Sequence, residues 1–342
     1  MVCRLTSLLP RLRRYRRCDV AFHILHPFHA SFLHPIAECL SGSWVSTADA
    51  DLIKGLRPRI LVLADHHYEM FSWVHDKRTL VYQVPHGLLS KNTIYEQWHS
   101  QADYICLPSE AFREEFTKRN TFPRREFLVT GWPLLDELFQ WRACSRSRYD
   151  GRRTILYAPT YNPELNSVAG IGEDLLDVVR AVDRDARLVI KPHPVIAEKF
   201  PGWMATWEDW CRKDEEVMLV RNTQVNIVPY LIAADVLVSD VSSVALCFLA
   251  LDRPVILWRN SEPIPEGWYY DKSGVEWHWV EFAERVASKR EFEAALQRAI
   301  SNPEERSPIR SHYCDLIFGP YQDGHAADRI AGHIMRVLNQ GC

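Results

Sequence analysis

The stretch Asp235 to Ser243 reads DVLVSDVSS, and the fold can be predicted from this pattern. Its first residues are apolar apart from the leading aspartate, and a polar turn with three serines and a second aspartate follows. A short apolar run that ends in a turn is typical of a buried strand in a parallel sheet. Ser242 to Leu251 then look helical, so the segment predicts a strand, a turn and a helix.

Similar apolar runs recur on both sides of this segment, with helix-like stretches between them. Strands that alternate with helices predict parallel sheets with right-handed crossovers. The predicted strands lie at 19–25, 60–64, 79–84, 104–107, 127–130, 154–158, 187–191, 217–220, 235–239 and 254–258. The predicted helices lie at 30–40, 173–182, 242–251 and 323–338.

A polar, basic and serine-rich segment separates the strands into two groups. It reads WRACSRSRYDGRR and spans residues 141–153. We therefore expect an α/β protein with two Rossmann-like, doubly wound parallel sheets and a cleft between the two domains. The expected parts are an arm at 1–17, a first domain at 18–140, a linker at 141–153, a second domain at 154–322 and a closing helix at 323–342.

Composition excludes several classes of protein. The 342 residues include 41 Lys and Arg against 44 Asp and Glu, and the net charge of −3 excludes a chain that is basic overall. The 12 Trp, 13 Tyr and 14 Phe exclude a disordered chain. No apolar run approaches the ~18 residues of a membrane-spanning helix. The nine Cys lack a Cys-x-x-Cys pair, which favours reduced thiols and argues against a structural zinc site.

The first 17 residues contain six arginines and no acidic residue, with leucines between the arginines. The basic part follows the apolar part, which does not fit a secretory signal. A basic arm with leucines could lie on an anionic membrane surface. The alternatives are a solvated basic end and an arm that attracts nucleic acid without a role. We expect a cytoplasmic protein that is peripheral on the inner face of the membrane through this arm.

Small, polar or histidine residues follow five of the predicted strands. Ligands of open parallel sheets bind beyond the carboxyl ends of the strands, so these turns are the candidate site. The turns are Pro85-His86-Gly87, Gly131-Trp132-Pro133, Pro159-Thr160-Tyr161, Pro192-His193-Pro194 and Ser239 to Ser243.

Each of these signals has a structural alternative. The serines at 242 and 243 could bind a pyrophosphate together with free amides at a helix start, or one residue of the turn could cap that helix. His86 has an imidazole suited to accept a proton at neutral pH, or it could be a structural hydrogen-bonder. Gly87 allows a ligand to approach the backbone closely.

A second group of histidines surrounds the first two predicted strands. It comprises His23, His26, His29, His34, His66 and His67, with Asp65 and Glu69 nearby. Three interpretations stay open: a metal cluster, contacts to a phosphate or acceptor, and plain polar loop residues. We expect no metal ion and no cofactor.

Seven motifs in order resemble those of the CDP-glycerol glycerophosphotransferase family, which includes the teichoic acid primases and polymerases. The resemblance spans roughly residues 80–330. The motifs are His86-Gly87, Gly131-Trp132-Pro133, Ile155 to Thr160, Lys191 to Pro194, Asp235 to Ser243, Arg253 to Ile256 and Asp323 to Ala326. The resemblance implies a GT-B fold, a peripheral membrane habit and a CDP-activated polyol phosphate as donor.

The resemblance also implies roles for individual residues. His86 matches the family's base, and His193 matches its second essential histidine. The second domain would bind the donor, through residues Thr160, Lys191, Ser239, Asp240, Ser242 and Ser243. The first domain would bind a glycan or lipid-linked acceptor, through residues His66, His67, Gly87 and Lys91. No nucleic acid partner is expected.

The sequence departs from the family pattern at three places. Leu88 and Leu89 follow His86-Gly87 where Thr-Pro is common, Val241 replaces a tyrosine, and Leu134 stands where an arginine is usual. The departures bear on the acceptor and on the transferred group.

The predicted reaction is transfer of a polyol phosphate to an acceptor hydroxyl, with release of CMP. The first alternative is a GT-B sugar-nucleotide glycosyltransferase or a UDP-sugar 2-epimerase, and the second is a nucleotide-binding subunit that is not an enzyme.

Overall fold

The computed structural model describes residues 18–65, 67–74, 78–89, 95–144, 152–172, 174–259 and 273–340. The predicted arm at 1–17 and the predicted site residues His66 and Lys91 lie outside the described residues. Among the described residues, no helix combines the length and the apolar character needed to cross a membrane.

Two six-stranded sheets form the framework, and every strand pair in both is parallel. The first sheet has the order β2-β1-β3-β4-β5-β6. Its strands are β1 (Val20–His23), β2 (Trp44–Thr47), β3 (Ile60–Leu63), β4 (Leu80–Gln83), β5 (Tyr104–Leu107) and β6 (Glu126–Val129). The second sheet has the order β12-β11-β10-β7-β8-β9. Its strands are β7 (Thr154–Ala158), β8 (Arg187–Ile190), β9 (Val217–Leu219), β10 (Val236–Ser239), β11 (Val255–Trp258) and β12 (Glu284–Val286).

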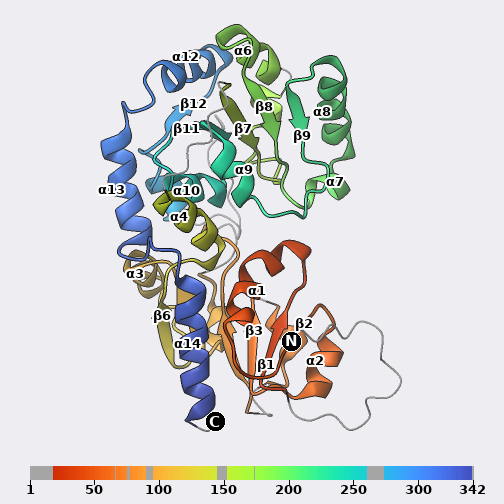
Figure 1. Cartoon of the computed structure of the whole chain (residues 1–342), viewed down its shortest axis with the longest axis vertical. Helices are drawn as coiled ribbons and strands as arrows, with labels where there is room; N and C mark the ends of the chain where they lie inside the picture. The colour runs from red at the N-terminus through yellow and green to blue at the C-terminus, as the bar shows by residue number, and fades with distance from the viewer. Residues whose placement is uncertain are drawn as a thin grey trace.

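Helices cover the sheets and form two lobes along the long axis of the molecule (Figure 1). The helices between the strands of the first lobe are α1 (Ala30–Glu38), α2 (Ala50–Leu56) and α3 (Glu110–Lys118), and α4 (Asp136–Ala143) follows β6. The short 3-10 turns are η1 (Pro27–His29), η2 (Tyr68–Phe71), η4 (Gln97–Gln101) and η5 (Pro133–Leu135). The second lobe contains α5 (Val168–Ile171), α6 (Asp174–Val182), α7 (Ile196–Lys199), α8 (Pro201–Lys213), α9 (Val228–Ala233), α10 (Ser243–Leu249), α11 (Val275–His278) and α12 (Lys289–Ser301).

The ten predicted strands are all present, and two further strands were not predicted. β2 is half-buried and contains Ser46 and Thr47, and β12 is only three residues long. Both lie at an edge of a sheet, where one side of the strand is unpaired and the apolar signal is weak. α4 extends to Ala143, three residues into the segment that the sequence predicts as a linker.

The chain returns to the first lobe at its end. α13 (Ser307–Phe318) packs against α10 and α3, and α14 (Ala326–Asn339) packs against α1 (Figure 1). The apolar face of α14 completes a core beneath the first sheet, with Ile330 and Ile334 fully buried. The predicted closing helix is therefore part of the first lobe, although it follows the second domain in the sequence.

A buried carboxylate on α4 fixes the start of α14. Asp136 is 8% exposed, and its two oxygens accept hydrogen bonds from the amides of Ala326 and Ala327, at 2.9 and 2.8 Å. These amides belong to the first turn of a helix and have no carbonyl partner within it. Gly324, with φ of +75°, allows this approach, because a Cβ there would lie 2.6 Å from Gln140 Cγ.

We predict that Asp136→Ala destabilises the protein by about 1–3 kcal/mol, because two buried amides lose their acceptor. The free energy of unfolding in urea measures the effect. Glu137→Ala changes an exposed residue of the same helix and is the matched control. Equal stability of the two variants would contradict the proposed role of Asp136.

Candidate functional site

A cleft lies between the carboxyl edges of the two sheets. It encloses about 860 Å³ of empty space, which includes its opening to solvent. The first lobe contributes Phe28, Ser31, Phe32, His86, Gly87, Trp132 and Leu134 to its walls. The second lobe contributes Ala158, Pro159, Lys191, Pro192, His193, Pro194, Val225, Asn226, Ile227, Ser242, Ser243, Val244 and Cys247.

Strand order explains why the cleft forms here. The chain reverses its direction of winding between β1 and β3 in the first sheet and between β7 and β10 in the second. Loops on the two sides of such a switch point separate and leave a crevice. Residues after β1, β7 and β10 line the cleft, and Asp65 after β3 supports His86.

The turn that contains His86 is held at three points. Trp132 donates from its indole nitrogen to the carbonyl of Pro85 at 3.1 Å, and the amide of Leu88 donates to Ser243 Oγ of the second lobe at 3.1 Å. The residue before Trp132 is Gly131, and its φ of +90° favours glycine. A side chain there would also be crowded, because its Cβ would lie 3.1 Å from the Cβ atoms of Ala326 and Tyr321. The Gly131-Trp132-Pro133 motif thus supports the histidine turn.

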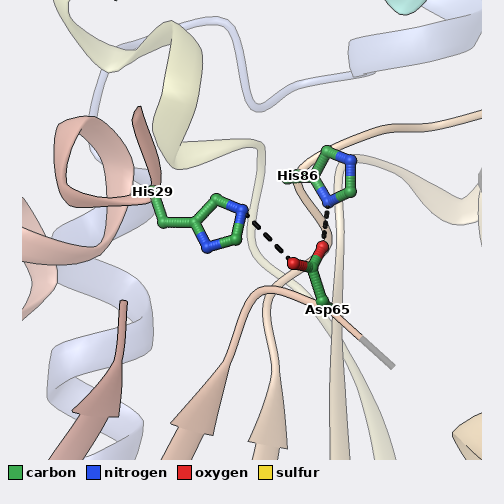
Figure 2. Close-up of side chains that lie close together, drawn as sticks. All are labelled: His29, Asp65 and His86. Atoms are coloured by element: carbon green, nitrogen blue, oxygen red, sulfur yellow. Dashed lines mark ion pairs between the residues drawn. The ribbon is translucent and has the colours of Figure 1, made fainter. Parts of the chain in front are cut away.

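The third point is an ion pair with Asp65, which follows β3. His86 Nδ1 lies 2.5 Å from Asp65 Oδ1, and His29 Nε2 lies 3.4 Å from the other carboxylate oxygen (Figure 2). The side chain of His86 is 28% exposed and that of His29 is 1% exposed. The carboxylate therefore stands between one ring that reaches the cleft and one that is buried.

Burial and charge act in opposite directions on these groups. Burial by itself raises the pKa of Asp65, but the charge and hydrogen bond of His86 outweigh it and hold the pKa below its usual value. Burial lowers the pKa of His29 to about 3, despite the opposing charge of Asp65. At neutral pH Asp65 is thus ionised and His29 is neutral.

His29, Asp65 and His86 could in principle hold a metal ion, since one ligand atom of each lies within 4.8 Å of the others. Ligands of a tetrahedral zinc ion lie ~2.0–2.2 Å from the metal and so more than about 3 Å from each other. The 3.4 Å separation of His29 and Asp65 fits this spacing, whereas the 2.5 Å between Asp65 and His86 is that of a hydrogen bond. The arrangement is thus a hydrogen-bonded carboxylate–imidazole pair.

The Lys191-Pro192-His193-Pro194 motif places a lysine and a histidine side chain in the opposite wall. Both residues follow β8, which ends at Ile190, and both line the cleft. Lys191 is 4% exposed, and its Nζ donates to the carbonyls of Pro192 and Thr223 at 3.1 and 2.9 Å. Burial lowers its pKa from 10.5 to about 8.

His193 is oriented by its own loop. Its Nδ1 accepts a hydrogen bond from the amide of Val195 at 3.4 Å, and its ring packs on Tyr161 with the centroids 4.8 Å apart. When Nδ1 accepts in this way, the proton of the neutral ring is on Nε2, which makes Nε2 a donor. The neutral ring of His86 has the opposite tautomer, because its Nδ1 donates to Asp65 and the lone pair is then on Nε2.

The Ser239 to Ser243 turn divides into buried supports and residues of the wall. Ser239 donates to the carbonyl of Ala158 at 2.7 Å, and Asp240 accepts from the amides of Thr160 and Ser167 at 2.9 and 2.8 Å. Ser239, Asp240 and Thr160 are nearly inaccessible, so they shape the loops behind the wall. Of the donor residues that the sequence predicts, Lys191, Ser242 and Ser243 line the cleft together with His193.

Both serines of the wall already make hydrogen bonds. Ser242 caps α10 by accepting from Val244, and Ser243 accepts from Leu88. Their hydroxyl protons remain available as donors, since a hydroxyl can donate and accept at the same time.

The predicted acceptor residues are not all brought together. Gly87 lines the cleft, whereas His67 pairs with Glu69 at 3.3 Å and is not part of the lining. Asp65 and His29 were named in the sequence only as members of a histidine-rich group, without an assigned partner. Only the positions of Asp65 and His29 in the sequence could have indicated a role in the site, because both residues follow strands at the switch point of the first sheet.

A family model matches residues 52–336 of the chain, and its description is CDP-glycerol:poly(glycerophosphate) glycerophosphotransferase. The chain belongs to this family. The teichoic acid glycerol-phosphate primase of Bacillus subtilis (strain 168) is 25% identical over 252 residues. The match covers 72% of this chain and 60% of the primase, so the chain spans about 60% of the length of this curated relative.

Solved structures show the same GT-B fold. A crystal of the wall teichoic acid polymerase TagF soaked with CDPG has a TM-score of 0.69 at 13% identity, covering 95% of this chain and 90% of that one. A structure described as that of a putative UDP-N-acetylglucosamine 2-epimerase from Listeria monocytogenes has a TM-score of 0.66 at 14% identity, covering 96% of this chain and 98% of that one. The two-sheet architecture predicted from the sequence is confirmed.

We predict that His29→Phe makes the stability of the protein less sensitive to acid. An unfolded histidine binds a proton below pH ~6.5, whereas folded His29 stays neutral down to about pH 3, so stability falls as pH decreases through this window. The loss in unfolding free energy between pH 7.5 and pH 5 should be about 2 kcal/mol smaller in the variant. Urea unfolding at both pH values measures it, and an unchanged loss would contradict the neutral state of His29.

Proposed function

We propose that this chain transfers glycerol phosphate from CDP-glycerol to an acceptor hydroxyl and releases CMP. The supporting observation is that a carboxylate-bound histidine of one lobe and Lys191, His193, Ser242 and Ser243 of the other line one cleft. Membership of the glycerophosphotransferase family supports the same donor and reaction.

In the proposed reaction His86 is the general base. Its Nδ1–H donates to Asp65, so Nε2 accepts the proton of the acceptor hydroxyl. The acceptor oxygen forms a bond to the phosphorus that bears glycerol, and the bond from this phosphorus to the oxygen bridging to CMP breaks. CMP leaves with that electron pair, and the ionised Asp65 stabilises the imidazolium of His86.

The opposite wall would stabilise the charge that develops on the diphosphate. The ammonium of Lys191 lies between two carbonyls and has a third N–H, and His193 offers Nε2–H as a donor. The hydroxyls of Ser242 and Ser243 add two further donors. Such donors are fixed before the reaction begins, so they require little reorganisation in the transition state.

The acceptor and the site of action are further parts of the proposal. The family description names poly(glycerophosphate), and a glycan or lipid-linked hydroxyl is the acceptor class that we propose. The six arginines among residues 1–17 support contact with an anionic membrane surface, which would place the protein on the cytoplasmic face of the membrane.

A GT-B fold is also used by UDP-sugar 2-epimerases, so the products must distinguish the candidates. Phosphotransfer yields CMP and a phosphodiester, whereas glycosyl transfer yields a nucleoside diphosphate and a glycoside. Product analysis with CDP-glycerol and UDP-N-acetylglucosamine as donors separates the two reactions.

We predict that His86→Ala lowers CMP release from CDP-glycerol by at least about 100-fold, because the general base is lost. Release of radiolabelled CMP in the presence of acceptor measures the rate. His312→Ala removes an exposed histidine of α13 and should retain the wild-type rate. Equal rates for wild type and His86→Ala would refute the assignment of the base.

We also predict that CDP binding weakens as pH rises through about 8, because Lys191 loses its charge there. Lys191→Met should bind CDP at least about tenfold more weakly at pH 7, since a charged contact is lost. Its affinity should also change less between pH 7 and pH 9 than that of wild type. Calorimetric titration measures both, and the same pH dependence in the variant would show that another group is responsible.

A further inference from the structure

His29 is a buried titratable group beside the proposed site. Its side chain is 1% exposed, and among the described residues neither ring nitrogen has a hydrogen-bond partner. Buried polar groups are nearly always paired, so an unpaired imidazole requires an explanation. The proposed reaction, as derived above, does not use this ring.

We propose that His29 is a positioning residue, which holds the carboxylate of Asp65 in the orientation that accepts the Nδ1–H of His86. This inference rests on the proposed function, since it concerns the base of that reaction. Its geometric basis is the arrangement of the carboxylate between two rings, one on each oxygen (Figure 2).

The two contacts of Asp65 are unequal. The His86 contact is 2.5 Å long, whereas His29 Nε2 lies 3.4 Å from the second oxygen and is not aligned as a hydrogen bond. Hydrogen bonds of catalytic groups are often long without substrate and tighten when the reaction complex forms. A small rotation of the His29 ring would align its N–H with Asp65, and this contact would then restrict rotation of the carboxylate.

The η1 turn supports both members of the pair from one side. His29 and Phe28 are successive residues of this turn, and their rings are 4.5 Å apart. Phe28 meets the ring of His86 edge-on at 5.8 Å, while His29 lies nearly parallel to it at 5.6 Å. The same short turn therefore limits the movement of the base and of the carboxylate that orients it.

A neutral imidazole suits this position better than a cation would. A lysine or arginine beside Asp65 would neutralise the carboxylate and weaken its attraction for the proton on His86 Nδ1. A neutral N–H donor fixes the carboxylate and leaves its charge to act on His86. Burial keeps His29 neutral. Of the strongest effects on its pKa, only the charge of Asp65 favours the protonated form, and burial outweighs it.

A double-mutant cycle tests the proposal. His29→Phe should lower kcat for CMP release about tenfold and leave the KM for CDP-glycerol unchanged, because donor contacts lie on the other wall. In the Asp65→Asn background the same change should lower kcat less than about twofold, since no carboxylate remains to be positioned. His29→Gln places an amide N–H near the position of Nε2 and should recover most of the rate.

Matched controls separate positioning from a general effect on folding. His99→Phe replaces another buried histidine of the first lobe, outside the cleft, and should leave kcat unchanged. Thermal unfolding of each variant confirms that it is folded. Equal losses from His29→Phe with and without Asp65 would overturn the proposal. It would also be overturned if a chelator abolished activity and zinc restored it in wild type but not in His29→Phe, because His29 would then be a metal ligand.

A second readout does not depend on turnover. Nitrogen-15 spectra of the histidine rings in the full chain report which nitrogen of His86 bears the proton. His29→Phe should reduce the fraction of the Nδ1–H form of His86 and leave His193 unchanged. An unchanged His86 signal in His29→Phe would overturn the positioning role. If the signal changes as expected but the wild-type protein is inactive with CDP-glycerol, only the proposed function is contradicted.

Discussion

Parallel pairing of every strand in both sheets is the constraint on which the rest of the structure depends. All carboxyl ends of a parallel sheet lie on one edge, so the connections that follow them share that edge. The two sheets present these edges to a common cleft, and residues distant in sequence meet there. His86 and Ser243 are the clearest case, since the turn after β4 bonds to the start of α10 through Leu88.

Buried polar groups around the cleft are satisfied mainly by loop backbone. Asp240 accepts two loop amides, Ser239 donates to a carbonyl of the neighbouring strand, and Lys191 donates to two carbonyls. Asp240, after β10, thus fixes the loop that follows β7, and Lys191, after β8, fixes the loop that follows β9. The wall is held before any ligand binds. Such preorganisation is what transition-state stabilisation by fixed dipoles requires.

The two lobes are joined by more than the connection between the domains. Arg142 of α4 donates to the carbonyl of Ala250 at 2.9 Å, and Ser109 donates to the carbonyl of Leu316 at 3.1 Å. α14 returns to the first lobe and is fixed there by Asp136. These contacts define the relative position of the two walls, on which a reaction between a base in one and a donor in the other depends.

The sequence by itself determined the class of fold, ten strands and the strand-end turns, because apolar runs and the turns that end them are local features. It also singled out the turn at Trp132 and the histidines at 86 and 193 as candidates for the site. Only the tertiary structure decided that Asp240 is a buried support, that Lys191 and His193 both reach the cleft and that α14 belongs to the first lobe. It alone placed Asp65 between His29 and His86, since three residues on separate turns meet through sheet order, which no local pattern encodes.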